Sequence, residues 1–144
     1  MEKYLVSACL AGVNCTYRGD SNLHPKVVEL FQTGCAWLVC PEQLGGLPTP
    51  RPPAEILGNK ILMKDGRDVT KNFVRGAQEA LRLAKLLNIK KAILKQRSPS
   101  CGYGQIYDGS HSGKIIAGMG VTATLLQENG IEIISEDKLN SIFL

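Results

Sequence analysis

Three cysteines of this sequence, Cys9, Cys40 and Cys101, each lie at or just beyond the end of a short apolar run that is typical of a buried strand. In an open parallel sheet the carboxyl ends of the strands meet at one edge, and ligands bind there. We therefore expect three thiols that are far apart in the sequence to share one edge of a sheet. Three thiolates at one place suit a soft metal ion or an iron–sulfur cluster.

The same cysteines are also compatible with roles that need no metal. The three residues could be small apolar side chains packed at strand ends, and Cys101 alone could be a thiol nucleophile. The sequence has no Cys-x-x-Cys pair, so neither a zinc ribbon nor a ferredoxin spacing is predicted. Cys15 could be a fourth ligand, although it lies deeper in a loop. Cys35 precedes the second apolar run, at the opposite end of the sheet, and is expected to be a buried structural thiol.

Acid–base and hydrogen-bonding candidates lie beside two of the cysteines. If three thiolates hold a four-iron cluster, one iron has no protein ligand, and an open coordination position makes a metal site catalytic. Glu42, two residues after Cys40, is the nearest general acid or base, and an anionic cluster would raise its pKa. It could instead be a solvated loop residue. Ser98 and Ser100 could donate hydrogen bonds to a substrate or to cluster sulfurs, or they could only stabilise their turn.

Weaker signals concern glycines, histidines and isolated cations. Residues 118–123 fit the dinucleotide-binding glycine pattern, and Glu136 lies near the place of a ribose-binding acid. The strand before this motif is short, and the motif lies in the C-terminal part of the chain instead of at the first strand of the fold. We therefore expect its glycines to allow close packing of a helix instead. His24 and His111 have no partner histidine at metal spacing and are expected at the surface or at caps. Three cations could balance cluster charge or bind an anionic substrate, although each alone is expected to be a surface charge: Arg51, Lys95 and Arg97.

Strands and helices alternate along the chain and would position these residues. Strands are expected at residues 3–8, 36–40, 92–94 and 131–134, and helices at 25–34, at 68–88 with Asp68 as N-cap, at 121–128 and at 137–143. A β-hairpin is expected at 54–63, a proline-rich loop without helix at 41–53, and a glycine-rich excursion at 102–113. This order predicts the α/β class: a three-layer Rossmann-like fold with a mostly parallel sheet and a small β-hairpin insertion, in one domain of residues 1–144.

Composition excludes several classes of protein. The chain has 144 residues, 44% of them hydrophobic, and a net charge of +4, so disordered and fibrous classes are excluded. Its lysines and arginines are scattered, which argues against nucleic-acid binding, and no apolar stretch is long enough to span a membrane. Residues 6–9 look like a lipoprotein cleavage box, but too few residues precede Cys9 for a signal peptide. A cytoplasmic protein with reduced thiols is expected.

Seven short blocks, spread nearly end to end along the chain, fit one known pattern. They are Ser7-Ala8-Cys9-Leu10-x-Gly12, Tyr17-Arg18-Gly19, Cys40-Pro41-Glu42-x-x-Gly45-Gly46-Leu47, Pro50-Arg51-Pro52-Pro53-Ala54-Glu55, Gly66-Arg67-Asp68-Val69-Thr70, Ser98-Pro99-Ser100-Cys101-Gly102 and Ile106-Tyr107-Asp108-Gly109. Together these blocks resemble a small bacterial family, formerly a domain of unknown function, that includes the thiouracil desulfidases.

The resemblance implies a [4Fe-4S] cluster bound by three cysteines that match Cys9, Cys40 and Cys101, with one iron not bound by protein. It implies that this iron takes the thione sulfur of a thiolated base while water attacks the carbon. The glutamate that matches Glu42 would assist the water, and the serine that matches Ser98 would assist at the substrate. The products would be uracil and sulfide, without net redox change. The desulfidases of this family lack a cysteine at position 15, which argues against that residue as a required ligand.

The leading hypothesis is therefore a cluster-dependent desulfidase for a thiolated pyrimidine, such as 2- or 4-thiouracil, with no nucleic-acid or membrane partner. One alternative is a non-catalytic iron–sulfur or metal sensor module, which would bind metal without turnover. Another is a metal-free cysteine hydrolase that uses Cys101. The hydrolase would be inactivated by alkylation of the apoprotein and would stay active after Cys9→Ser or Cys40→Ser.

Overall fold

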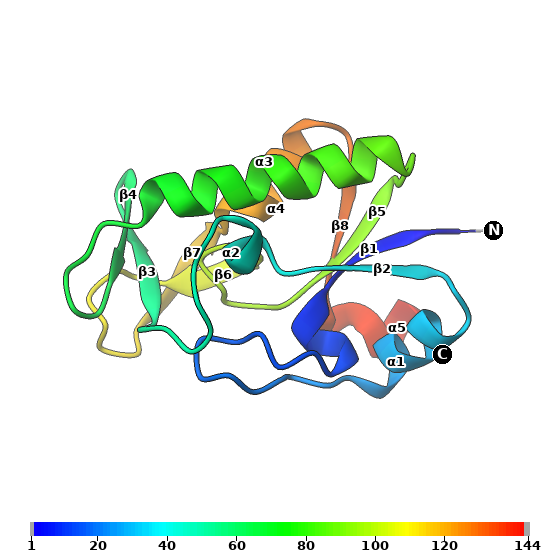
Figure 1. The fold of residues 1–144 in the computed structure, drawn as a ribbon, viewed down its shortest axis with the longest axis horizontal. Coiled ribbons are helices and arrows are strands. Elements are labelled where there is room, and N and C mark those ends of the chain that lie inside the picture. The colour runs from blue at the N-terminus through cyan, green and yellow to red at the C-terminus, as the bar shows by residue number, and fades with distance from the viewer. Residues whose placement is uncertain (1, 143–144) are drawn as a thin grey trace.

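Four parallel strands form the central sheet of the computed structural model, which describes residues 2–142 (Figure 1). In spatial order they are β2, β1, β5 and β8, with the bounds Ala36–Val39, Tyr4–Ser7, Lys91–Leu94 and Glu132–Ser135. Each strand is a short and mainly apolar run, which is typical of strands that are covered on both faces. All three pairings within this sheet are parallel, so the predicted α/β class with a mostly parallel sheet is confirmed.

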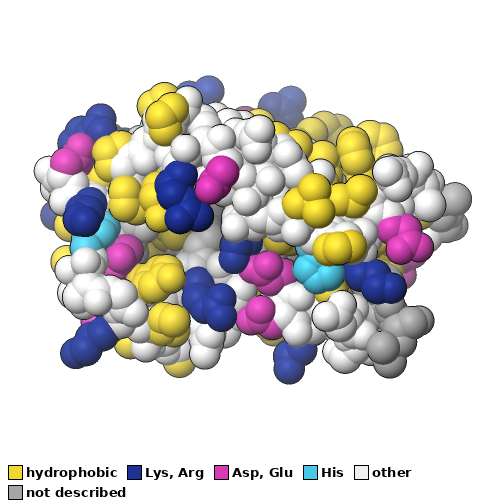
Figure 2. Space-filling view, turned by 90° about the horizontal axis from the view of Figure 1, so that it is seen from below, with side chains coloured by type: hydrophobic (Ala, Val, Ile, Leu, Met, Phe, Trp, Pro, Cys, Tyr) yellow, Lys and Arg dark blue, Asp and Glu magenta, His cyan; other side chains and the backbone are white. Residues whose placement is uncertain are grey.

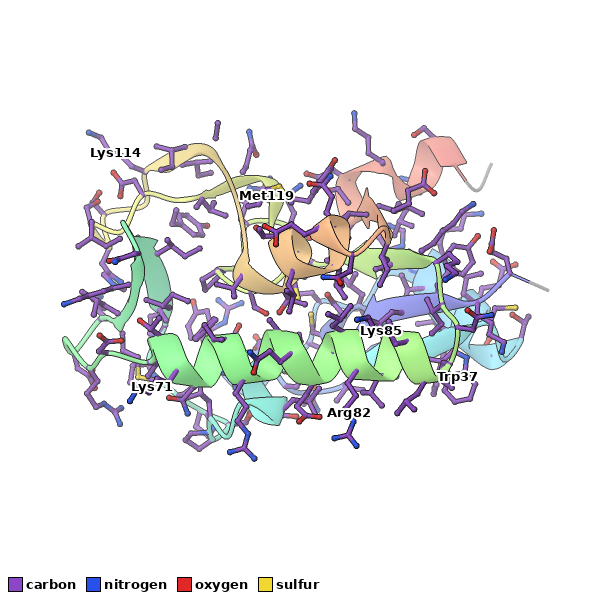
Figure 3. The ribbon with its side chains drawn as sticks, turned by 90° about the horizontal axis from the view of Figure 1, so that it is seen from above. Trp37, Lys71, Arg82, Lys85, Lys114 and Met119 are labelled. Atoms are coloured by element: carbon purple, nitrogen blue, oxygen red, sulfur yellow. The ribbon has the colours of Figure 1, made fainter. Side chains whose placement is uncertain are left out.

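Helices cover both faces of the sheet and complete three layers (Figure 1). On one face α3 (Thr70–Leu86) and α4 (Val121–Glu128) lie side by side, as Figure 3 shows from above. On the other face lie α1 (Pro25–Gln32) and α5 (Leu139–Ile142). Among residues 2–142, none of the helices combines the length and the apolar character that a membrane span needs.

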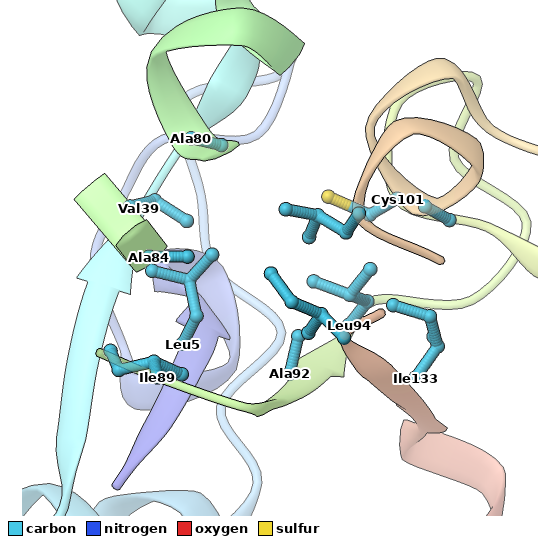
Figure 4. Packing of buried hydrophobic residues seen from close by; sticks show 12 residues of the cluster. Leu5, Val39, Ala80, Ala84, Ile89, Ala92, Leu94, Cys101 and Ile133 are labelled. Atoms are coloured by element: carbon cyan, nitrogen blue, oxygen red, sulfur yellow. The ribbon is translucent and has the colours of Figure 1, made fainter. Parts of the chain in front are cut away.

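Two hydrophobic cores lie on opposite faces of the sheet. Because successive residues of a strand point to opposite faces, Leu5 packs in the core under α3 and α4, whereas Val6 packs in the core over α1 and α5. Ala80 and Ala84 are the buried residues of α3 in the first core (Figure 4), and the partly buried Leu81 and Leu83 pack against it. The small side chains of the two alanines let the helix approach the sheet closely, and both are fully buried.

The direction in which the chain winds reverses at β1. The chain reaches β2 first and β5 later, yet these strands pair with opposite sides of β1. In open α/β sheets, the crevice at such a reversal, outside the carboxyl ends of the strands, is the usual place for a ligand. β1 continues there into the 3-10 turn η1 (Ala8–Ala11), which carries Cys9, and β5 continues into the loop that carries Cys101. The strand order thus directs both cysteines to one crevice.

Two antiparallel hairpins project beyond this edge, at one end of the molecule (Figure 1). The first, β3 (Ala54–Leu57) with β4 (Lys60–Met63), confirms the predicted hairpin insertion. The second, β6 (Tyr103–Tyr107) with β7 (Ile115–Met119), was predicted only in part: a short strand was expected at residues 114–116, but residues 102–113 were expected to be a glycine-rich excursion and no hairpin was predicted. The glycines in these strands make them hard to predict from the sequence, since glycine weakens an isolated strand. At Gly118 a Cβ would lie 2.8 Å from the end of the Ile106 side chain, so a larger residue would require that side chain to move.

Local differences from the prediction have simple causes. The loop expected at residues 41–53 begins with a short helix, α2 (Pro41–Leu44), because proline fits the first helical position after an extended Cys40. The N-cap of α3 is Val69, and the Asp68 carboxylate accepts a hydrogen bond from the Thr70 N–H at 2.9 Å instead. The helix expected at 137–143 is the short turn η2 (Glu136–Lys138) followed by α5, and residue 143 lies outside the described residues.

We expect the replacement Gly76→Ala to destabilise the protein. A Cβ on Gly76 would overlap the carbonyl oxygen of Pro41, so α2 and α3 could not keep their contact. The free energy of unfolding should fall by roughly 1–3 kcal/mol, although alanine favours a helix over glycine by about 1 kcal/mol. Urea denaturation measures the change. Gln78→Ala, on the exposed side of the same helix, is the control, and a Gly76→Ala midpoint at or above wild type would contradict the close contact.

Candidate active site

A cavity of about 520 Å³ lies at the carboxyl edge of the sheet, beside the two hairpins. Figure 2 views the molecule from below and shows a hollow bordered by Lys and Arg side chains. Four cysteines line the cavity, namely the three predicted ligands Cys9, Cys40 and Cys101, together with Cys15. Cys35 lies apart, just before β2 at the amino end of the sheet, and it is half-buried rather than buried as expected.

Cys40 is held at the first turn of α2. It is the N-cap residue of that helix, and its Sγ lies 3.7 Å from the carbonyl oxygen of Cys15. A hydrogen bond with the Cys15 side chain lowers the pKa of Cys40 to about 7, and the backbone N–H of Gln43 contributes in the same direction. The same hydrogen bond, together with burial, raises the pKa of Cys15. Cys40 is thus the thiol of this cavity that loses its proton most readily.

Cys101 lies in a turn that Ser98 stabilises. The Ser98 hydroxyl oxygen accepts hydrogen bonds from the backbone N–H groups of Ser100 (3.0 Å) and Cys101 (3.1 Å). The Ser100 hydroxyl bonds to Thr122 in α4 at 2.7 Å. A Cβ on Gly120 would overlap the Ser100 carbonyl oxygen, so this glycine serves the close helix packing that the sequence suggested. Burial raises the pKa of Cys101 to about 12.

Gln96 joins the cysteine turn to the sheet, and sequence reasoning gave it no role. Its side-chain amide donates to the Tyr103 carbonyl oxygen (2.9 Å) and to the Ser135 hydroxyl (2.6 Å). Its amide oxygen accepts from the N–H groups of Arg97 and Tyr103. The available signal was its position, two residues after an apolar strand, and the structure shows that it is buried, where an amide must find several partners.

Arg51 and Glu42 form an ion pair in the wall of the cavity, with a distance of 3.0 Å between Nε and Oε1. The Arg51 side chain is only 2% exposed, so the expectation of a surface charge is wrong for this residue. Its guanidinium also donates to the carbonyl oxygens of Cys15 (2.9 Å) and Pro48 (3.1 Å). Burial raises the pKa of Glu42, and Arg51 partly opposes that rise.

Two further ionic groups of the cavity, Lys95 and His111, also lie beside carboxylates. Lys95 Nζ lies 2.6 Å from the Glu136 carboxylate, which accepts the Gln96 N–H as well. Glu136 therefore stabilises the start of the cysteine loop, rather than lying free for a ribose. His111 also lines the cavity, where its Nδ1 lies 3.5 Å from Glu55, whereas His24 caps α1 through the Lys26 N–H as expected.

The donor set fits an iron–sulfur cluster better than a single ion. Across residues 2–142, no three Cys, His, Asp or Glu side chains come close enough to share one metal ion. The thiols instead surround one cavity, and none of them forms a disulfide. A polynuclear cluster takes one thiolate at each of several irons, so its ligands need not meet at a point. Cys9, Cys40 and Cys101 are therefore suited to bind such a group.

Comparison with known proteins identifies the family of this chain. A family model described as 2-thiouracil desulfurase matches residues 4–138. The chain belongs to this family. Among its relatives, the uncharacterized protein YbbK of Bacillus subtilis (strain 168) is 46% identical, over 96% of this chain and 98% of its own. The solved structure of the [4Fe-4S]-dependent thiouracil desulfidase TudS superposes with a TM-score of 0.93 at 46% identity, covering 98% of this chain and 95% of that one. The resemblance inferred from the sequence blocks is confirmed.

In this member of the 2-thiouracil desulfurase family, Arg51→Met should leave Glu42 as a buried carboxylate without a cation. The free energy of unfolding should fall by about 3 kcal/mol, the low end for a buried pair, because the Glu42 side chain is still 18% exposed. The Glu42 pKa should rise further, since burial then acts without opposition. Burial disfavours the ionised form, so the loss of stability should be largest near neutral pH and should shrink as falling pH protonates Glu42.

Denaturant titrations at several pH values measure this effect. Arg67→Met is the matched control, because Arg67 pairs with Asp65 at the surface, where the side chains are 65% and 45% exposed. Equal effects of the two replacements, or a loss that grows on acidification, would contradict the role of Arg51 as the buried partner of Glu42.

Proposed function

We propose that this chain is a [4Fe-4S]-dependent desulfidase that removes sulfur from a thiolated pyrimidine such as 2- or 4-thiouracil. One observation carries the proposal: cysteines that follow three different strands line one cavity together with Glu42. The similarity to TudS supports the same function. Cys9, Cys40 and Cys101 would bind the cluster and leave one iron without a protein ligand. When bound, the cluster would supply a soft Lewis acid for the sulfur of the substrate.

The residues of the chain would handle the base and the water. Overall the ring carbon exchanges a C=S bond for a C=O bond, water supplies the oxygen, and sulfur leaves as sulfide with the protons of water, so no electrons are transferred. Glu42 would take a proton from the attacking water at its carboxylate and return it later. Burial keeps its pKa above that of an exposed glutamate, nearer the range of a useful acid–base group. Ser98, which lines the cavity, would assist in binding the base.

A metal-free hydrolase that uses Cys101 as nucleophile has less support. The thiolate is the reactive form of cysteine, and a pKa raised to about 12 leaves Cys101 protonated at neutral pH. No general base bonds to its Sγ in the described part of the chain, where the Ser100 hydroxyl lies 3.9 Å away. A site rich in unpaired thiols is consistent with a reducing, cytoplasmic location.

Metal analysis of the anaerobically reconstituted protein tests the proposal. We expect four irons and four acid-labile sulfides per chain, and release of sulfide from thiouracil. Cys9→Ser, Cys40→Ser and Cys101→Ser should each lose most of the iron and the activity. Cys35→Ser, outside the cavity, should keep both. Wild-type protein without specific iron would refute the cluster, and a full cluster without sulfide release from any thiobase would favour the sensor alternative.

Glu42→Gln should separate catalysis from cluster binding. The amide keeps the size of the side chain but cannot take a proton, so iron content should stay at the wild-type level while sulfide release falls by roughly 10²–10⁴-fold. Steady-state assays on iron-matched samples measure the loss. Activity within a few-fold of wild type would remove Glu42 from the acid–base role.

A further inference from the structure

Among residues 2–142, Arg97 is the only half-buried cation of the cavity whose side chain has no hydrogen bond or ion pair. Three other cations of the cavity each lie beside a carboxylate: Arg18, Arg51 and Lys95. Lys64 also lines the cavity without a carboxylate partner, but it is exposed to water. A charged group that is partly removed from water gains most from a ligand that replaces the lost hydration. Arg97 is therefore the cation of this cavity with the strongest need for a ligand.

The carboxylates that line the cavity are already engaged by other groups. Glu42 accepts a hydrogen bond from Arg51 at 3.0 Å. Glu55 accepts two backbone N–H groups of the loop between β6 and β7, at 3.0 and 3.1 Å, and lies 3.5 Å from the His111 ring. Neither of them bonds to Arg97. The donors of its guanidinium are therefore available to a molecule that enters the cavity.

The backbone of Arg97 is held in a conformation that arginine rarely adopts. Its φ is +64°, in the left-handed region, where the Cβ of most residues is crowded. Two contacts maintain this conformation: the Gln96 amide oxygen accepts the Arg97 N–H at 3.0 Å, and a β-bridge pairs Arg97 with Ile106. Glycine would adopt this φ without cost, so the fold itself does not need an arginine here. Strained residues that their surroundings hold in place are concentrated at functional sites.

A thiolated pyrimidine carries an acceptor that suits this side chain. Besides the C=S group that is exchanged, thiouracil has a carbonyl oxygen that the reaction leaves unchanged. The guanidinium has five N–H donors in a planar fork and no acceptor, and it is always charged. Arg97 directly precedes Ser98, which lines the same cavity. Both residues would therefore contact the same base.

We propose that Arg97 binds the carbonyl oxygen of the thiolated pyrimidine that is not exchanged, and thereby determines specificity for bases that carry this oxygen. This inference rests on the proposed function, because it concerns the substrate of the same cavity. The hydrogen bond is made to a part of the base that does not react. It should therefore lower KM more than it raises kcat.

Matched pairs of substrates test this contact in the anaerobically reconstituted protein. One pair is 4-thiouracil with pyrimidine-4-thione, and the other is 2-thiouracil with pyrimidine-2-thione. The second member of each pair lacks the carbonyl that is not exchanged. We expect Arg97→Met to lower kcat/KM for the thiouracil about 10- to 100-fold, mainly through KM, and to leave the thione within a few-fold of wild type. The preference of the wild type for the thiouracil should largely disappear.

Two further variants separate binding from structure and from general charge. Arg97→Gly should show the same selective loss with an unfolding midpoint close to that of wild type, because relief of the left-handed backbone offsets the greater freedom of glycine in the unfolded chain. Lys64→Met, which removes the exposed cation, should affect both members of a pair equally. Uracil is bound but not converted, and its Kd by calorimetry should rise about 10-fold or more in Arg97→Met.

Sulfide release from thiouracil that is unchanged in Arg97→Met, or lowered equally for both members of a pair, would overturn the inference while the proposed function stood. Equal losses in Arg97→Gly together with a much lower unfolding midpoint would assign Arg97 a structural role and overturn it as well. Iron-loaded wild-type protein that released no sulfide from any of the four compounds would refute the proposed function, and this inference with it. If circular dichroism shows that Arg97→Met does not fold, Arg97→Gly decides.

Discussion

The parallel pairing of β1 with β5 is the constraint on which the candidate site depends. It joins the two strands whose carboxyl ends lead into the turn of Cys9 and the loop of Cys101, and β2 pairs with the other side of β1 and leads to Cys40. Because the pairing is parallel, all three chain segments leave the sheet at the same edge. Antiparallel pairing of any one strand would have sent its cysteine to the opposite end, where Cys35 lies.

Within the loops, Arg51 is the residue that holds separate segments of the site together. Its single guanidinium bonds to the Glu42 carboxylate and to the Cys15 carbonyl oxygen, so it joins the acid–base candidate to the segment that carries a thiol. A buried ion pair of this kind adds little net stability over a well-packed apolar pair. The ion pair instead positions the site, because the planar guanidinium has several donors and fixes both of its partners at defined distances.

Some of this site could be predicted from the sequence and some could not, for physical reasons. The positions of Cys9, Cys40 and Cys101 relative to the sheet followed from short apolar runs, which encode strands locally. The roles of Arg51 and Gln96 did not follow, because their partners come from segments whose path depends on tertiary packing. The β6–β7 hairpin was missed because its glycines lower strand propensity. They are tolerated only because each strand pairs with the other.

The four cavity cysteines are divided between the two cores of the protein. Cys101 packs in the core under α3 and α4 (Figure 4), whereas Cys9, Cys15 and Cys40 pack in the core over α1 and α5. A cofactor bound by Cys9, Cys40 and Cys101 would therefore link the two layers, because its ligands belong to both cores. Partial opening of one layer would release Cys101, and partial opening of the other would release Cys9 and Cys40, so cofactor retention would report on the integrity of the whole fold rather than on the cavity alone.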